Sequence, residues 1–348
     1  MKLTLPPSAQ GLASLRTVPA GLCLAWVFAL AAAGMSTVHA QGKAAADPAA
    51  YPSRPVKLVI PAAAGGGPDT LTRILAGKLS ELWKQQVVSE NVVGAGGNIG
   101  HERAARAAPD GYTFLIGMIG PMAINPSLQD KLGFDPQKDF APVAMISRYP
   151  NILAVHPGVA LRSLQELLAW GKANPDKLRY GEPGTGTTPH LSAVMLGNMT
   201  GMRMLRVPYK SSTQMLTDTL AGHIDMIFLN PAALLPHIKA GALRAIAITG
   251  ATRAPYAPDI PTLIEAGLPG YEVTSWYGMF APAGTPPALI AKVNADLLKV
   301  MALPEIRDQF IARGDEPAGG SAEQAGNYLR AEIAKWRDVI RQANLKVE

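Results

Sequence analysis

The sequence predicts an α/β fold built from two similar lobes. Strands and helices alternate along most of the chain, and the alternation runs twice, with the second run beginning near residue 150. The length of 348 residues agrees with this, since a domain typically has roughly 100–200 residues. Only 17% of the residues are charged, below the about 25% of an average soluble protein, so both lobes are expected to hold buried sheets.

The first lobe is predicted from a strand, a glycine-rich loop and a helix in succession. The β-branched, alternating run at 55–60 predicts a strand, and the loop at 61–69 follows it. Apolar residues at three- and four-residue spacing then predict a helix that ends near Trp83. Further strands are expected at 87–91 and 112–118, with a helix that opens at 94–100. This order implies a mainly parallel sheet flanked by helices.

The second lobe repeats this construction. Ser163 and Glu166 form a capping box, and Pro189 suits a first helical position because its missing N–H costs nothing there. Strands are expected at 152–155, 177–180, 206–208, 224–228 and 245–248. Helices are expected at 163–173, 189–200, 211–221 and 231–239.

The chain is expected to pass between the lobes twice. It crosses near 148–152 and returns near 272–278, within an extended segment at 272–281. Helices at 286–302 and 321–343 then complete the first lobe. We therefore assign 51–150 and 275–348 to the first lobe and 151–274 to the second. Two crossovers make a hinge, and a ligand crevice is expected between the lobes.

The N-terminus resembles a secretory signal peptide. Lys2 and Arg16 precede an apolar stretch at 20–34, and Ala40 ends a small-x-small cleavage signature. Residues 1–40 are predicted to be removed after Ala40, leaving a flexible leader at 41–50 and a periplasmic protein. A membrane anchor is the alternative, but the apolar run is shorter than the ~20 residues that a spanning helix needs. The single Cys23 leaves with this segment, which excludes disulfides from the mature chain.

Motifs for catalysis and for cofactors are missing from the sequence. It has no phosphate-binding GxxxxGK[ST] and no GxSxG, and the GAGGNIG at 94–100 lacks the last glycine of a dinucleotide fingerprint. The histidines do not have metal-ligand spacing. Lys and Arg form no basic stripe, which argues against nucleic acid. We predict no catalytic residue, no metal and no cofactor.

Each lobe instead carries a Gly-rich loop between a strand and a helix that starts at a proline. The loops are 65–68 in the first lobe and 184–189 in the second, and a third loop at 119–121 also follows a strand. Such loops let a ligand approach the backbone, and helix N-termini favour anions. Ligands in open α/β sheets bind at the carboxyl ends of strands, where all three loops are expected. Alternatively, the glycines and prolines only make tight turns.

Many motifs, in order along 51–345, resemble the substrate-binding proteins of tripartite tricarboxylate transporters, also called Bug receptors. They include YPSRPVKLVIPAAAGGGPD, ENVVGAGGNIG, APDGYTFLIG, VPYK and SWYGMFAPAGTP. The resemblance implies a two-lobed periplasmic binding protein of type II, the Venus flytrap fold. It also implies capture of a small carboxylate and delivery to a large and a small membrane subunit, and we expect a monomer. A sensor that signals to a membrane kinase and an exported enzyme acting on an organic acid are the alternatives.

The resemblance and the loops together give a set of candidate ligand-binding residues. They are Ala64, Gly65, Gly66, Gly67, Asp69, Ile119, Gly120, Pro121, Thr185, Gly186, Thr187, Thr188, His190, Tyr209, Leu229 and Asn230.

The chain departs from the family pattern beside this site. Ala62 replaces a phenylalanine of the first loop, and Leu229 replaces an aspartate that many members have. These changes make the crevice roomier and less negative, so we expect a ligand with more apolar bulk than aspartate or malate, such as an aromatic or longer-chain acid. Glu182 either points outward or pairs with a ligand cation. The pair Trp276 and Tyr277 belongs either to the crevice wall or to hinge packing.

Overall fold

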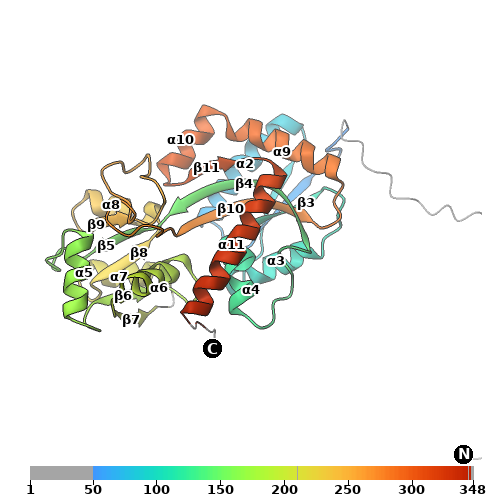
Figure 1. Ribbon diagram of the computed structural model, residues 1–348. Coiled ribbons are helices and arrows are strands. Elements are labelled where there is room, and N and C mark those ends of the chain that lie inside the picture. The colour runs from blue at the N-terminus through green and yellow to red at the C-terminus, as the bar shows by residue number, and fades with distance from the viewer. Residues whose placement is uncertain (1–49, 210, 344, 346–348) are drawn as a thin grey trace, which may run out of the picture. The chain divides into compact units, whose positions relative to one another are not determined.

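The computed structural model describes residues 50–209, 211–343 and 345 (Figure 1). The predicted signal peptide at 1–40, with Cys23, and nearly all of the predicted leader lie outside the described residues.

The described chain contains two separate sheets, each flanked by helices (Figure 1). The first sheet has six strands in the order β11-β4-β10-β3-β1-β2, and the second has five in the order β7-β6-β8-β5-β9. The strands of the first sheet are β1 (Val56–Ile60), β2 (Val87–Asn91), β3 (Thr113–Met118), β4 (Phe140–Pro150), β10 (Thr274–Pro282) and β11 (Glu316–Gly319). Those of the second are β5 (Ile152–Val155), β6 (Arg179–Glu182), β7 (Leu205–Pro208), β8 (Met226–Leu229) and β9 (Arg244–Ile248).

Helices connect the strands within each sheet. Those from the chain segments of the first sheet are α2 (Gly67–Trp83), η1 (Ala95–Gly97), α3 (Asn98–Ala105), η2 (Gly120–Ile124), α4 (Asn125–Leu128), α9 (Pro287–Met301), α10 (Pro304–Ala312) and α11 (Ala322–Gln342). Those from the segments of the second are α5 (Leu164–Ala173), α6 (Thr188–Thr200), α7 (Ser212–Leu220) and α8 (Pro231–Lys239). None of the helices that the structure describes is both long and apolar enough to cross a membrane.

The sheets are mixed, which corrects the expectation of mainly parallel ones. The strands β1, β2 and β3 are parallel, as the β-α-β-α-β order predicts, but β10 pairs antiparallel with both β3 and β4. The reason is the double crossing. The strand β4 leaves the first sheet and continues into β5, while β10 returns from the second part of the chain, so the two must run in opposite directions. In the second sheet, β5 is likewise antiparallel to β8 and β9.

Several elements were not predicted, namely β4, η2, α4, α10 and β11. The strand β4 holds Pro142 and Pro150, and proline within a run argues against a central strand because it cannot donate to the ladder. The structure accommodates Pro142 opposite Phe280, next to a shift in the register between β4 and β10. Proline is tolerated at such irregular positions.

The buried core crosses from one sheet to the other. One cluster of buried side chains includes Phe280 of the first sheet and Phe228 of the second. Trp276 of β10 is fully buried in the same cluster, so of the two alternatives stated for it, packing is the one observed. Its indole N–H donates to Glu332 of α11, which also accepts from Trp336. The C-terminal helix is thereby fixed against the strand that returns from the second lobe (Figure 1).

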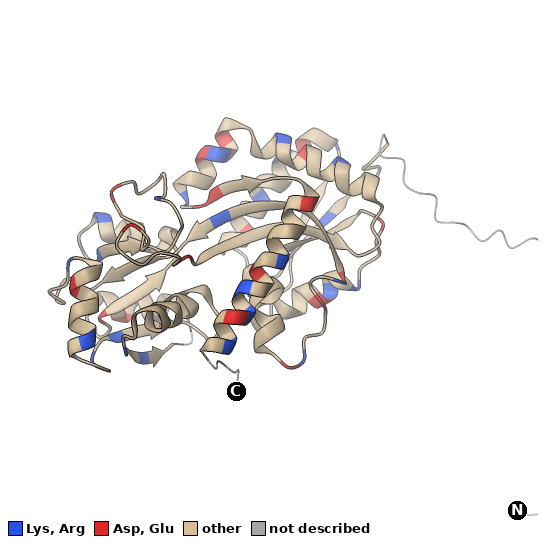
Figure 2. Ribbon diagram, viewed as in Figure 1, with Lys and Arg blue, Asp and Glu red and all other residues tan. Residues whose placement is uncertain are grey.

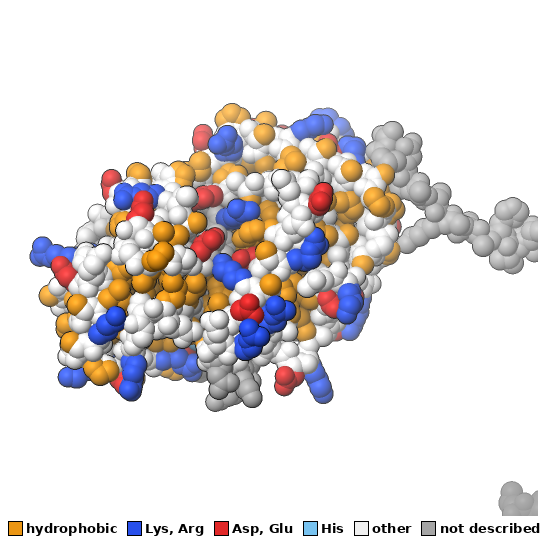
Figure 3. All heavy atoms as spheres, in the orientation of Figure 1, with side chains coloured by type: hydrophobic (Ala, Val, Ile, Leu, Met, Phe, Trp, Pro, Cys, Tyr) orange, Lys and Arg blue, Asp and Glu red, His pale blue; other side chains and the backbone are white. Residues whose placement is uncertain are grey.

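Charged side chains lie mostly on the outside, in both signs. They are dense along the outer side of α11 (Figure 2), and on the face in Figure 3 no single sign gathers into a patch. This face therefore lacks the continuous basic stripe that nucleic-acid binding would need.

Candidate functional site

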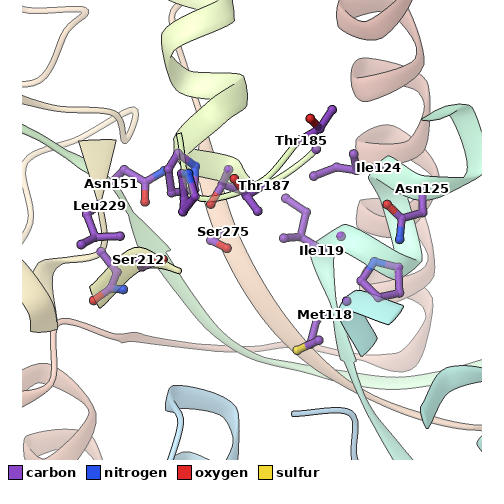
Figure 4. Close-up of a pocket in the computed structure, with 18 of the residues that line it drawn as sticks. Met118, Ile119, Ile124, Asn125, Asn151, Thr185, Thr187, Ser212, Leu229 and Ser275 are labelled. Carbon is purple, nitrogen blue, oxygen red and sulfur yellow. The ribbon is translucent and has the colours of Figure 1, made fainter. Parts of the chain in front are cut away.

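A cavity of about 470 Å³ lies where the two sheets' segments meet, and we call it the main cavity. Figure 4 shows its two sides: Met118, Ile119, Ile124 and Asn125 come from the first sheet's segments, and Ser212 and Leu229 from the second's. The crossing segments contribute Asn151 and Ser275 between them. The crevice expected between the lobes is therefore present, and both crossovers line it.

The lining of the main cavity combines apolar and polar residues, and its described side chains carry no charge. Among the residues that the structure describes, no Lys, Arg, Asp, Glu or His side chain lines it. Three helices of nine or more residues begin there, because Thr188 opens α6, Ser212 opens α7 and Asn230 caps α8. The first N–H groups of a helix have no partner within it, and the helix dipole makes that end positive. Among the described residues, the groups that favour an anion in this cavity are thus helix N-termini rather than charged side chains.

The Gly-rich loop of the second lobe is held in shape from within. The Thr187 hydroxyl accepts from the backbone N–H of His190 at 3.4 Å, which caps α6. The N–H of Gly186 donates to Nδ1 of His190 at 3.1 Å. Gly186 has φ +79°, and a methyl group placed on it would lie 2.5 Å from Cδ2 of Leu128, which belongs to α4. Glycine at 186 therefore permits close approach of the two sides of the cavity.

His190 supports this loop and does not line the cavity. It is 1% exposed, and because its Nδ1 accepts from Gly186, a neutral ring carries its proton on Nε2. Burial lowers the pKa of His190, an effect that the nearby Glu182 carboxylate opposes. The residue is thus a neutral anchor of the loop at neutral pH.

Two other candidates are engaged elsewhere. The Tyr209 hydroxyl donates to Asp218 at 2.9 Å, and Tyr209 does not line the main cavity. Glu182 is 2% exposed, accepts from the Thr185 hydroxyl at 3.1 Å and lies 2.9 Å from Nε of Arg206. Glu182 therefore neither points outward nor faces the cavity, contrary to both alternatives considered for it. Its charge is balanced by Arg206 within the second lobe.

The Gly-rich loop of the first lobe lines an adjoining cavity rather than the main one. Gly65 and Gly67 line this second cavity, whereas Ala64, Gly66 and Asp69 line neither. The Asp69 carboxylate is turned into its own loop. It accepts from the Gly65 N–H at 2.8 Å, from Nε of Arg73 at 3.0 Å and from Nδ2 of Asn91 at 2.9 Å. Burial acts to raise the pKa of Asp69, but these hydrogen bonds outweigh it and lower the pKa to about 2.

Replacing Asp69 by alanine is expected to destabilise the Gly-rich loop of the first lobe. The Gly65 N–H would lose its acceptor and Nδ2 of Asn91 would keep only the Ala62 carbonyl. A hydrogen bond to a charged group contributes about 1.5–3 kcal/mol. We expect Asp69→Ala to lower the free energy of unfolding by about 2 kcal/mol and Asp69→Asn, which keeps one acceptor oxygen, by less. Urea unfolding of the three proteins at pH 7 measures this. Equal losses in both variants would contradict the assignment.

The remaining predicted residues do line the main cavity. They are Ile119, Gly120, Pro121, Thr185, Gly186, Thr187, Thr188, Leu229 and Asn230. Their contact with a ligand stays a prediction, since the structure gives only their place.

Apart from Tyr277, sequence reasoning missed the residues that the crossing segments and the 94–100 segment contribute to the cavities. Tyr149 of β4 and Tyr277 of β10 line both cavities, and their hydroxyls are 3.0 Å apart. Ala95 and Gly96 also line the main cavity, and Asn98 links Asn125 to Gln129 through its amide. The available signal was the GAGGNIG motif, which was weighed only as a nucleotide fingerprint. Tyr277, left open between crevice wall and hinge packing, is part of the wall.

The described residues around these cavities offer no metal-binding arrangement. There, no group of three His, Cys, Asp or Glu residues is placed to hold a metal ion. What the geometry offers is a cavity with backbone N–H groups, hydroxyls and amides facing an apolar wall.

Comparison with known proteins agrees with this geometry. The family model described as tripartite tricarboxylate transporter family receptor matches residues 71–345. The chain belongs to this receptor family. It is 35% identical over 292 residues to a UPF0065 protein in the tcbD-tcbE intergenic region of Pseudomonas sp., covering 84% of this chain and 87% of that protein. It is 32% identical over 299 residues to Protein BugT of Bordetella pertussis, covering 86% of this chain and 92% of that protein.

Solved structures of the receptor family share the fold. A protein of R. palustris solved with adipate superposes with a TM-score of 0.77 at 37% identity, covering 85% of this chain and all of that one. The periplasmic binding protein BugD superposes with a TM-score of 0.73 at 32% identity, covering 85% of this chain and 100% of that one. The MatC protein from Rhodopseudomonas palustris with bound malate superposes with a TM-score of 0.70 at 31% identity. The match covers 83% of this chain and 100% of that one. The two-lobed type II fold and the function as a solute-binding receptor are thereby established.

Proposed function

We propose that this receptor captures a small organic carboxylate in the main cavity, in the periplasm, and delivers it to the large and small membrane subunits of a transporter. It acts as a monomer and performs no chemistry on its ligand. The predicted removal of residues 1–40 after Ala40 releases it from the membrane.

The observation that carries this proposal is the main cavity, at which α6, α7 and α8 begin and which no charged side chain of the described residues lines. Unpaired N–H groups with the positive ends of helix dipoles select an anion. The donors among the described residues belong to the backbone and to Thr, Ser and Asn side chains, so these donors bring no charge that must be desolvated. A carboxylate is one of the organic anions that such donors bind, and two solved relatives carry the carboxylates adipate and malate.

The wall of the main cavity supports a ligand with apolar bulk. Met118, Ile119 and Ile124 line one side, and Leu229 lines the other (Figure 4). Burial of apolar surface contributes about 25 cal/mol per Å². A longer-chain or aromatic acid gains this contribution, whereas a short polar acid such as aspartate does not.

The capture mechanism follows from the double crossing. The strands β4 and β10 pair along their whole length. The chain enters the second sheet after β4 and returns from it before β10. A ligand that contacts both lobes joins them, and rotation about these strands buries it. Burial excludes water, so each hydrogen bond to the carboxylate becomes electrostatically stronger.

A thermal-shift screen of the purified protein against carboxylates tests the proposal. The panel contains short, long-chain and aromatic acids, with uncharged amides of the same acids as controls. A ligand at about 100 times its dissociation constant adds about 2.7 kcal/mol to stability. We expect a clear rise in melting temperature with long-chain or aromatic acids and none with their amides. If no acid raises the melting temperature, the proposal fails.

Two variants of α7 test whether the acid binds in the main cavity. Ser212 lines it, while Thr213, the next residue, is exposed and does not. Both occupy the first turn of α7, where an added aspartate is favourable for the helix. We expect Ser212→Asp to abolish the acid-induced shift, because it puts a negative charge among the donors, and Thr213→Asp to leave the shift unchanged. A ligand shift that survives in Ser212→Asp would place the site elsewhere.

A further inference from the structure

Asn151 lies at the crossing between β4 and β5 and lines the main cavity, although it is only 1% exposed. Thr249 holds its backbone on both sides. The Asn151 N–H donates to the Thr249 hydroxyl at 2.8 Å, and the Asn151 carbonyl accepts from the Thr249 N–H at 2.9 Å. The side-chain amide of Asn151 therefore starts from a fixed point, where the chain passes from one lobe to the other.

The orientation of this amide is set by Ser192 of α6. The Ser192 hydroxyl has a single hydrogen, and it donates that hydrogen to the Thr188 carbonyl at 2.7 Å. Its oxygen can then only accept, so the atom of Asn151 that lies 3.1 Å from it must be the donor Nδ2. No described residue donates to Oδ1 of Asn151, and the described residues do not seal this oxygen off either. In Figure 4 it is turned away from α6 and into the cavity.

A second asparagine of the main cavity has the opposite polarity. Oδ1 of Asn230 accepts from the Ala233 N–H at 3.0 Å and so caps α8, which leaves Nδ2 as the end available to a ligand. Asn151 directly precedes β5, and Asn230 directly follows β8. Because the first residue of β5 pairs with the last residue of β8 in an antiparallel register, the two asparagines are neighbours. The cavity thus offers a donor and, beside it, an acceptor.

An acceptor in an anion-binding cavity is unfavourable unless the ligand supplies a hydrogen to it. A carboxylate oxygen against Oδ1 of Asn151 would bring two acceptors together, and a buried acceptor without a partner costs free energy. An ammonium group could donate, but no carboxylate among the described residues lines the cavity to balance its charge. The helix N-termini also disfavour a cation. A hydroxyl group, which donates without a charge, meets both conditions.

We propose that Asn151 is a specificity-determining residue, whose amide oxygen selects acids that carry a hydroxyl group close to the carboxylate. Ser192 is the positioning residue that keeps this oxygen turned to the cavity. The inference rests on the proposed function, because it presupposes a carboxylate at the helix N-termini of the main cavity. It narrows the ligand from acids in general to those with a neutral donor beside the carboxylate, in preference to an ammonium group.

Calorimetric titration of the full mature protein with matched acids tests the selection. The acids share one carbon skeleton and carry no substituent, a hydroxyl on the second or third carbon, a hydroxyl at the far end, or an amino group on the second carbon. We expect a hydroxyl beside the carboxylate to strengthen binding about 10- to 100-fold over the unsubstituted acid. The far hydroxyl and the amino group should bring no gain. Equal affinities throughout, or a gain only with the far hydroxyl or the amino group, overturn the inference and leave the receptor function intact.

Two variants assign the selection to this amide. Asn151→Leu keeps a branched side chain and removes the acceptor, so it should reduce the preference for the hydroxy acid to less than about twofold. Ser192→Ala frees the amide of Asn151 to rotate and present Nδ2, so it should lower the preference as well. Asn327→Leu is the matched control, because Asn327 lies exposed on α11 and lines neither cavity. It should leave the preference unchanged.

The readout is the ratio of the two affinities, because damage to the fold alone weakens both acids in equal proportion and leaves the ratio as it was. An Asn151→Leu protein that keeps the wild-type ratio therefore overturns the role of Asn151. Should that variant not fold, the Ser192→Ala protein decides, and an unchanged ratio there overturns the inference. A wild-type protein that binds no acid overturns the proposed function and this inference with it.

Discussion

Replacing Glu332 by alanine is expected to lower the free energy of unfolding by about 2–6 kcal/mol. The Glu332 carboxylate is 5% exposed, and its Oε2 accepts from the indole N–H of Trp276 at 3.1 Å and of Trp336 at 3.0 Å. Both indoles are fully buried. Removing the acceptor leaves two buried donors without a partner, and each such donor costs about 1–3 kcal/mol.

Glu332→Gln is the matched control for this prediction. Its amide oxygen can accept from both indoles, and it loses only the charge and the contact of Lys335 with Oε1 at 3.4 Å. Urea unfolding, followed by tryptophan fluorescence, should give a loss for Glu332→Gln that is less than half that for Glu332→Ala. Equal losses would mean that the charge of Glu332, rather than its role as acceptor, stabilises α11 against β10.

A second large effect is expected from His101 on acidification. His101 is completely buried, its Nδ1 donates to the Gly97 carbonyl at 2.9 Å, and its Nε2 accepts from the Met118 N–H at 3.4 Å. The imidazole ring stacks on the ring of Phe134, with the two ring centroids 5.4 Å apart. Burial lowers the pKa of His101 from 6.5 to about 4, although the Gly97 carbonyl opposes this. The neutral ring is therefore part of the folded state.

The sign of the effect follows from proton binding. Between pH 6.5 and 4 the unfolded chain binds a proton at His101 and the folded chain does not, so acid favours unfolding. The stability that neutral His101 contributes is complete above pH 6.5 and is lost as the pH falls to about 4, a loss of about 3 kcal/mol.

The measurement is the difference between wild type and His101→Gln, because other groups titrate in the same window. Asp315, with its pKa raised to about 7, holds a proton in the fold below that pH and so contributes with the opposite sign. Glutamine has a donor and an acceptor but no titration. We expect the stability difference between the two proteins to shrink by about 3 kcal/mol from pH 7 to pH 4. A difference that does not depend on pH would show that His101 is not the responsible group.

His101 also links the fold to the site. It lies on α3, directly after the 94–100 segment, and holds the Gly97 carbonyl and the Met118 N–H together. Met118 lines the main cavity beside Ala95 and Gly96. A neutral His101 therefore keeps one wall of the cavity in place, and acidification loosens that wall together with the fold.

The sequence alone determined the local elements and the class of the protein. Periodicity placed α2 and the strands β1 to β3, and the capping residues Ser163 and Ser321 placed the starts of α5 and α11. These signals are local, since they depend on neighbours within about one helical turn. The motifs spread over 51–345 carried the family, and the loop at 184–189 was correctly placed at the crevice.

The tertiary structure decided which residues share a cavity, because that depends on pairing across long stretches of chain. Sequence gave no sign that Asp69 turns into its own loop or that Glu182 pairs with Arg206. The antiparallel place of β10 beside β4 is set by the double crossing, over 120 residues apart in the chain. That pairing brings Tyr149 to Tyr277 and sets both beside Asp315, a cavity wall assembled from three distant segments that no local pattern can reveal.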